Sequence, residues 1–236
     1  MQKSKAYWIA AGVGLSLAIL AAGGLWYDLA RVRIPAFPLN SADTISSWSF
    51  RGAYTGNDTL IAQANADSAH LTSLIGKGQY DDYDLYLGIG NDKNLMGDGQ
   101  SAYQQYSRSI AIYPNKGLAY TNLGHLMDEL GAYNTAADAY AKAVAVESGQ
   151  IVYHVMRLSF LAMRLPSDSA RMLAAFTDAS KQFGDNAQVL SIEAQWLESQ
   201  KRYADAITAW QRAKLLSPGK DTSAVDAEIA RLKAKR

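Results

Sequence analysis

The feature that most constrains the fold of this chain is a segment that recurs along it. The stretch YSRSIAIYPN, residues 106–115, returns as YAKAVAVESG at 140–149 and, less closely, as WQRAKLLSPG at 210–219. In each stretch an aromatic residue is followed three positions later by a small one, and Tyr106 and Tyr140 stand 34 positions apart. Self-similarity at a fixed period of this length predicts one supersecondary unit that is stacked several times.

The period defines a frame in which the packing positions of a helix pair are filled consistently. Small residues fall at Gly90, Gly124 and Ala194 in the first helix and at Ala102, Ala136 and Ala206 where the second begins, and the aromatic falls at Tyr106, Tyr140 and Trp210. Small residues let two helices cross closely, and a large aromatic fills the gap to the next unit. The pattern resembles the tetratricopeptide repeat (TPR), a 34-residue helix–turn–helix unit with characteristic small and aromatic positions.

The resemblance implies an all-α fold, a TPR-type helical solenoid of about four helix–turn–helix units with a C-terminal capping helix. Stacked repeats need such a cap, because the last unit otherwise exposes its apolar side. We expect an N-terminal transmembrane anchor with its flanks over residues 1–33, a proline-containing linker over 34–56, a leading helix over 57–82, TPR-like repeats over 83–220 (83–116, 117–150, 151–186 and 187–220) and the capping helix over 221–236.

Two of the expected units depart from the pattern. The third is two residues too long, has Pro166 in its turn and places Leu158 where a small residue is usual, so its helix packing does not follow from the pattern. If the extra residues lie at the turn, Phe176 takes the aromatic position. The first unit has Gly88 and Gly90 in its first helix, and each costs about 1 kcal/mol relative to alanine.

An uncharged run, residues 6–27, precedes the repeats and has about the length that spans a bilayer. Trp8 and Trp26 stand at its two ends, as interfacial residues of a retained span do. This favours a single-pass anchor over a secretory signal peptide, for which AAGG at 21–24 would supply the cleavage site. Small residues at every fourth position predict a contact with another membrane helix: Ala10, Gly14, Ala18 and Ala22.

The orientation of this segment rests on charge and layout. Lys3 and Lys5 precede the run and Arg31 and Arg33 follow it, so the positive-inside rule is nearly balanced. A short amino-terminal tail before one long soluble region is the usual layout of a signal anchor. We therefore expect the soluble part on the extracytoplasmic side of the membrane.

Composition and motifs exclude several classes of function. The net charge is +1, and residues 34–236 carry 19 basic and 21 acidic side chains, whereas nucleic-acid binders are strongly basic. There is no cysteine, which excludes disulfides and thiolate metal sites. HLMDE at 125–129 falls short of the metalloprotease motif H-E-x-x-H, and no Walker A or G-x-S-x-G motif is present. We expect no catalytic residue, cofactor, metal, nucleic acid or small-molecule substrate.

In TPR domains the inner groove is lined by positions two, five, nine, twelve and thirteen of each first helix. Carried over to this sequence, the resemblance implies a partner-binding groove formed by Leu118, Thr121, His125, Asp128, Glu129, Gln188, Ser191, Gln195 and Glu198. The third unit adds an apolar zone with Val152 and Met163. Because the groove is polar and mildly acidic, a basic or mixed extended segment is the ligand that it favours.

Three smaller expectations concern packing. Trp48 and Phe50 alternate with polar residues and are expected to dock on the repeats. His154 falls at a position that tyrosine takes in other units, so it is expected in the core. Ser223 is the expected N-cap of the last helix.

These observations predict a membrane-anchored TPR scaffold or adaptor that binds a protein or peptide segment in its groove, within a cell-envelope assembly. Two alternatives remain. The chain could be a permanent structural subunit of a membrane complex, with its membrane helix paired to another. It could also be an enzyme whose site has no recognisable motif.

Overall fold

The computed structural model describes residues 36–217 and 221–235. The anchor predicted at residues 1–33, its orientation and its contact residues lie outside these ranges, and those residues are Ala10, Gly14, Ala18 and Ala22. Among the helices of the described ranges, none has both the length and the apolar character needed to cross a membrane.

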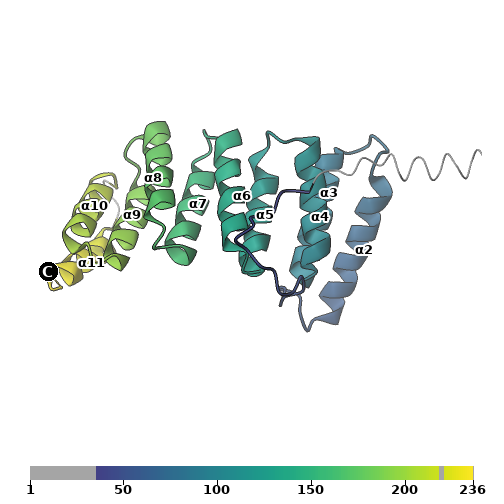
Figure 1. Ribbon diagram of the computed structural model, residues 1–236, viewed down its shortest axis with the longest axis horizontal. Helices are drawn as coiled ribbons and strands as arrows, with labels where there is room; N and C mark the ends of the chain where they lie inside the picture. The colour runs from purple at the N-terminus through teal and green to yellow at the C-terminus, as the bar shows by residue number, and fades with distance from the viewer. Residues whose placement is uncertain (1–35, 218–220, 236) are drawn as a thin grey trace, which may run out of the picture. The chain divides into compact units, whose positions relative to one another are not determined.

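The described residues form an all-helical structure, as predicted, with one isolated β-bridge between Ser49 and Asp98. Consecutive helices lie side by side in chain order (Figure 1). They are α2 (Asp58–Leu74), α3 (Asp82–Met96), α4 (Gly99–Ile112), α5 (Gly117–Glu129), α6 (Tyr133–Val146), α7 (Ile151–Arg164), α8 (Ser169–Phe183), α9 (Ala187–Ser199), α10 (Tyr203–Leu215) and α11 (Ser223–Lys233).

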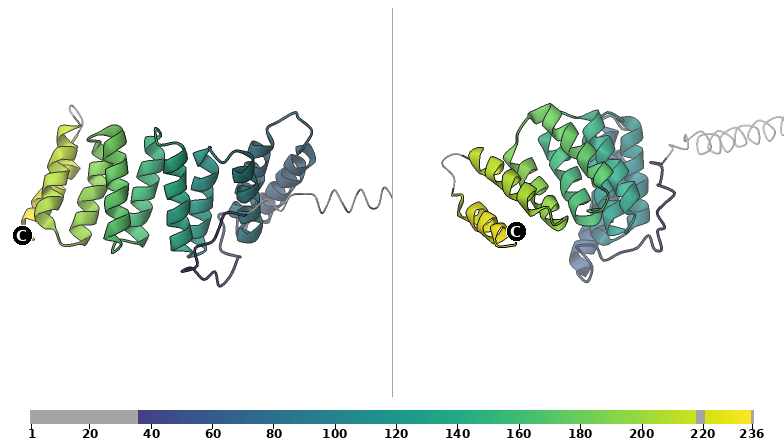
Figure 2. Two further views of the ribbon diagram at one scale, coloured as in Figure 1. Left: turned by 45° about the horizontal axis from the view of Figure 1, so that its top comes forward. Right: turned by 60° about the vertical axis from the view of Figure 1, so that its left-hand side comes forward.

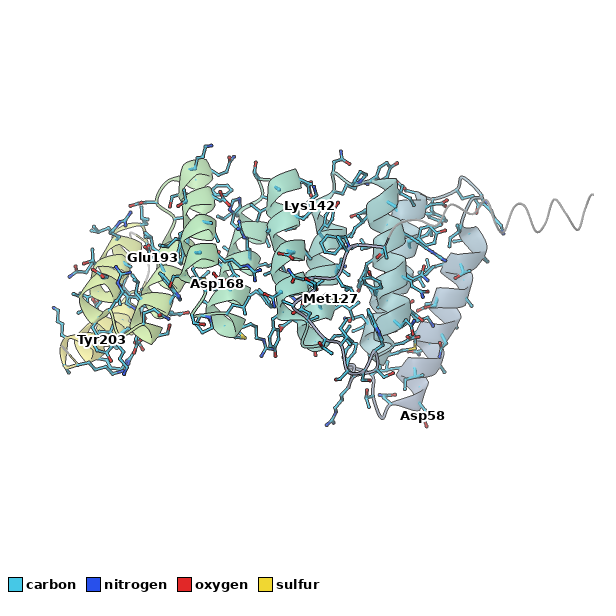
Figure 3. All side chains as sticks on the ribbon, in the orientation of Figure 1. Asp58, Met127, Lys142, Asp168, Glu193 and Tyr203 are labelled. Carbon is cyan, nitrogen blue, oxygen red and sulfur yellow. The ribbon has the colours of Figure 1, made fainter. Side chains whose placement is uncertain are left out.

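The helices pack as pairs joined by short turns, namely α3–α4, α5–α6, α7–α8 and α9–α10 (Figure 2). We call α3, α5, α7 and α9 the first helices and their partners the second helices. Each second helix also packs on the next first helix, as α4 does on α5 and α6 on α7. One continuous core results, and it includes the fully buried Met127 of α5 (Figure 3).

Close crossing within a pair depends on glycine lying against an aromatic ring. A Cβ atom on Gly90 would lie 2.5 Å from Cε1 of Tyr106, and one on Gly124 would lie 2.9 Å from Cζ of Tyr140. Neither distance occurs for a real Cβ, so the ring occupies the space that a side chain would need. Helix α3 therefore runs unbroken through Gly90 because the packing of Tyr106 outweighs the cost of glycine in a helix.

The same aromatic position connects two of the pairs to the next one along the chain. The ring centroids of Tyr140 on α6 and Phe160 on α7 are 5.1 Å apart. Those of Phe176 on α8 and Trp196 on α9 are 5.8 Å apart. Both separations are typical of stacked or tilted aromatic pairs.

The pair α7–α8 is packed less closely than the other three pairs. Leu158 and Met172 are both fully buried at its crossing, where the other pairs have glycine or alanine, so these side chains separate the helices. The longer turn after α7 contains Pro166, whose carbonyl oxygen accepts hydrogen bonds from Trp196 Nε1 (2.9 Å) and Gln200 Nε2 (3.0 Å). Helix α9 thus holds the inserted turn in place.

The residues before α2 form an extended strap, which we define as residues 36–52, and it lies along the second helices α4 and α6 (Figure 1). Trp48 packs on Tyr103 with ring centroids 5.2 Å apart, and Phe50 packs against the core, so both dock as predicted. Main-chain bonds from Phe50 N to Gly97 O and from Gly99 N to Trp48 O fasten this end of the strap.

Asp43 of the strap caps helix α6, which has no side-chain cap of its own. Its carboxylate accepts hydrogen bonds from the main-chain N–H groups of Asn134 (3.1 Å) and Thr135 (2.6 Å) and from both of their side chains. Partial burial acts to raise the pKa of Asp43, but these hydrogen bonds together outweigh it and leave the pKa below its ordinary value.

At the carboxyl end, α11 packs on α10 as a cap. The prediction of Ser223 as its N-cap is wrong: the capping position is Thr222, whose side chain accepts no hydrogen bond from a main-chain N–H of the helix and donates instead to Asp226. The carboxylate of Asp221 instead accepts a hydrogen bond from Ser223 N (2.8 Å). His154 is buried, as predicted, with Nε2 3.0 Å from the carbonyl oxygen of Ser148.

We expect Gly90→Ala to destabilise the protein by about 1–3 kcal/mol, because the new methyl group must displace the buried ring of Tyr106. Gly88→Ala in the same helix is the matched control. Its Cβ would meet only the terminal Cδ1 of Leu71, at 3.0 Å, so the change should be neutral or stabilise by up to about 1 kcal/mol. Urea denaturation of the two variants measures the difference, and equal stabilities would contradict the packing described here.

Asp43→Ala should reduce the free energy of unfolding by about 1–2 kcal/mol, because α6 then loses its only carboxylate cap. Amide hydrogen exchange should locate the effect at Asn134 and Thr135. Exchange at these two amides that stays as slow as in the wild type would show that the strap does not cap the helix.

Candidate functional site

The first helices form a layer of their own. Helices α3, α5 and α7 each contact the next first helix directly, so side chains on the common outer side of the layer form one surface. We call this surface the first-helix face and define it by the exposed residues Leu118, His125, Glu129, Val152, Met163, Gln188 and Gln195. The strap lies on the second helices and leaves this face uncovered.

Helix α5 presents three of the five predicted residues on one side. Leu118, His125 and Glu129 are spaced by seven and four positions, which places them in line along the helix, and all three are exposed. Leu118 has 45% of its surface exposed to solvent. The prediction of Thr121 as a contact residue is wrong: it is only 2% exposed, and its hydroxyl donates to the carbonyl oxygen of Gly117 at 3.1 Å.

Asp128 lies beside this line but is already paired. Arg164, the last residue of α7, donates from Nε to Asp128 Oδ1 at 2.7 Å, and its guanidinium lies 5.5 Å from the ring centroid of Tyr133. The face is therefore less acidic than the sequence predicted. Arg164 follows directly after the groove positions of its unit, which is why the family pattern does not include it.

His125 is exposed on the outer edge of α5 but packs with one side of its ring on the neighbouring helix. Its imidazole packs edge-on against Tyr140, with ring centroids 5.5 Å apart. Burial lowers its pKa below the ordinary value, although Asp128 and Glu129 act in the opposite direction. In the described ranges, no group of three histidine or acidic side chains is arranged to hold a metal ion.

The predicted residues of α9 divide into open and occupied ones. Gln188 and Gln195 are exposed, whereas the hydroxyl of Ser191 donates to the carbonyl oxygen of Ala187 at 2.8 Å. Glu198 is bound by Arg231 of α11, with Nη2 at 2.6 Å, and by Lys235 just beyond that helix, with Nζ at 3.0 Å. The capping helix thus uses the carboxylate that we had expected a partner to bind.

The apolar zone predicted for the third pair lies open to solvent. Val152 begins α7 with 45% of its surface exposed, and Met163 near its end has 70% exposed. Together with Leu118 on the neighbouring helix, they make the first-helix face partly hydrophobic. An exposed apolar group rimmed by polar residues is typical of a protein contact.

One feature near this face had no signal in the sequence. An open hollow of about 340 Å³ lies between α2 and α3 and is lined by Asp67, His70, Leu71, Gly88, Asn91 and Asp92. Asn91 Oδ1 accepts hydrogen bonds from Tyr106 Oη and Asn122 Nδ2, both at 2.9 Å. Burial raises the pKa of Asp92, whose carboxylate accepts a hydrogen bond from Ser68. Helix α2 lies outside the repeat pattern, so the pattern could not predict this hollow.

No family model and no curated protein matches the chain. Solved structures do match. The crystal structure of MamA superposes with a TM-score of 0.52 at 12% identity, over 78% of this chain and 95% of that one. The Cut9–Hcn1 hetero-tetramer of the APC/C superposes with a TM-score of 0.50 at 17% identity, over 74% of this chain and 34% of that one.

A thermophilic TPR protein of Thermus thermophilus gives a TM-score of 0.49 at 16% identity, over 75% of this chain and 93% of that one. These neighbours are TPR-type proteins, and the first two share the fold of this chain. The chain therefore has the TPR-type helical solenoid predicted from its repeats.

The pairing of Glu198 makes the docking of α11 sensitive to acid. The hydrogen bond from Arg231, together with that from Lys235, lowers the pKa of Glu198 from 4.5 to about 2. A depressed pKa means that the stabilisation is complete above pH 4.5 and is lost as the pH falls toward 2. We expect the urea midpoint of the wild type to fall more between about pH 6 and pH 3 than that of Glu198→Gln. Equal shifts would show that this pair does not hold the cap.

Proposed function

We propose that the chain is a docking scaffold that binds an extended segment of another protein on its first-helix face. The observation that supports this most directly is the open line of Leu118, His125 and Glu129, continued by the exposed Val152 and Met163 of the next first helix. Nothing in the described chain covers these side chains, whereas the strap lies along the second-helix side. Apolar anchors beside hydrogen-bonding groups are the usual composition of a protein contact.

The chemistry of the face favours a ligand with apolar and basic residues. Leu118, Val152 and Met163 provide apolar contacts, and Glu129 is a carboxylate with no salt bridge in the described structure. Residues 36–98 add a negative field, with eight acidic and three basic side chains. A positive segment would be drawn toward this end of the repeats, and an acidic one repelled.

We further propose that residues 6–27 hold the scaffold at a membrane, with the repeats on the extracytoplasmic side as part of a cell-envelope assembly. The support is the uncharged run with tryptophan at both ends. Protease treatment of intact and opened cells tests the orientation. Cleavage of the repeats only after the cells are opened would overturn it.

A permanent structural subunit remains the second candidate. Leu173 on α8 and Leu215 on α10 are exposed on second helices, so hydrophobic surface is not confined to one side of the repeats. A subunit that is enclosed in a larger complex is expected to have hydrophobic surface on several sides, because each side is buried against a neighbouring subunit. Such a subunit would lose its partners only when several surfaces are changed together.

The docking proposal is tested by full-length variants carrying Leu118→Ser and Glu129→Lys in a pull-down analysed by mass spectrometry. We expect a partner held by the wild type to be reduced at least about tenfold, because an apolar anchor and the unpaired carboxylate are both lost. Leu173→Ser is the matched control, since it removes a leucine of 55% exposure from a second helix. Asp128 is left unchanged because its replacement would also release Arg164.

Equal retention of the partner by the first-helix variant and by the control would contradict docking on this face. Loss of the partner with the Leu173 variant and not with the first-helix variant would place the contact on the second helices instead. Thermal unfolding of each variant shows whether the repeats remain folded.

A further inference from the structure

We propose a second recognition site, chiefly on the second helices, that binds an extended segment with an aromatic residue and an aspartate six positions later. In each molecule this site is filled by the chain's own strap, and the strap of a second copy fits it equally. We define the strap site by the residues that contact it: Tyr103, Ser107, Tyr120, Asn134, Thr135 and Asp138. The inference does not depend on the first-helix face, which is made by other side chains.

The first anchor of the strap is Phe37. Its ring meets Tyr120 edge-on, with centroids 5.9 Å apart. Its main chain is bound on both sides, since Phe37 N donates to Ser107 Oγ at 3.2 Å and Tyr103 Oη donates to Phe37 O at 2.5 Å. The site therefore recognises an aromatic side chain and the peptide unit that carries it.

The second anchor is Asp43, which accepts four hydrogen bonds at the start of α6. Between the anchors, Asn40 donates from its main chain to Thr135 Oγ1 (2.9 Å) and from Nδ2 to Asp138 (2.8 Å). Side chains of the strap site thus contact the side chains of three residues of the segment, Phe37, Asn40 and Asp43. Recognition by side chains at defined spacing is the property of a peptide site rather than of a simple linker.

The contacts extend beyond the strap itself. The side-chain oxygen of Asn134 accepts a hydrogen bond from Arg171 Nη1 of α8 at 2.9 Å. The same amide side chain that donates to Asp43 therefore also joins α6 to the loosely packed pair α7–α8. Filling the strap site therefore fixes the start of α6 against α8. A copy that lost its strap would gain stability from a strap supplied by another molecule.

The two ends of the strap are held differently, and this permits exchange. At residues 50–52 the strap lies so close to α3 that a Cβ on Gly52 would be 2.3 Å from Leu95 O, and one on Gly97 would be 2.1 Å from Phe50 O. The stretch from Phe37 to Asp43 is held chiefly by side chains, together with two main-chain N–H groups of α6 that bind Asp43. Because it is attached to the same chain, the strap has an effective concentration of about millimolar at its site. It therefore occupies the site unless its own contacts are weakened or straps of other molecules are present at a comparable concentration.

The test uses a fluorescein-labelled peptide of residues 36–48 and the full chain carrying Phe37→Ala and Asp43→Ala. These changes weaken the chain's own strap and leave every residue of the strap site in place. We expect the peptide to bind this variant at least about tenfold more tightly than the wild type and to raise its melting temperature. The same peptide with Asp43→Ala should do neither.

A folded variant that does not bind the peptide, or that binds both peptides equally, would overturn the proposal. If the variant fails to fold, two single variants replace it. The natural chain has no cysteine, so in a mixture of Asn40→Cys and Asp138→Cys molecules the two thiols are brought together most often where one copy's strap lies on another. Mixed dimers beyond those of each variant alone support exchange, and their absence at high protein concentration contradicts it.

Discussion

The structure depends on one type of contact, that between a small residue of a first helix and the aromatic ring of its partner helix. Where glycine provides the space, as at Gly90 and Gly124, the ring lies directly on the backbone and the pair is tight. Where Leu158 and Met172 fill the crossing, α7 and α8 separate. The rings at this aromatic position, Tyr140 and Phe176, also pack on the next first helix, so one sequence position contributes both to the spacing within pairs and to the continuity of the core.

This packing decides which side chains are left for function. Residues that point between the helices are committed to the core, and the first helices retain one open side with Leu118, His125 and Glu129. The second helices have a different use, because α4 and α6 hold the strap through Phe37 and Asp43. The proposed docking face and the proposed strap site are thus two surfaces of one stack, each made chiefly by helices of a different layer.

The sequence was sufficient for the fold and only partly for the site. Periodic small and aromatic residues predicted the TPR-type solenoid because each has a steric role that spacing reveals. Contacts between distant segments carry no such signal. The pairing of Asp128 with Arg164 and of Glu198 with Arg231 joins residues more than 30 positions apart, and both removed charges that we had assigned to a partner. The prediction for Thr121 was wrong because a position in the helix does not show that the hydroxyl donates to a main-chain carbonyl of the same helix.

Site-specific photo-crosslinking in the cells that make the protein tests the central claim, that partners bind the first-helix face, most directly. A crosslinking amino acid is placed at Leu118, Glu129 or Met163 and, for comparison, at Leu173 on a second helix. We predict that the first three positions capture the same protein and that Leu173 does not. Capture from Leu173 alone, or equally from all four positions, would contradict the claim.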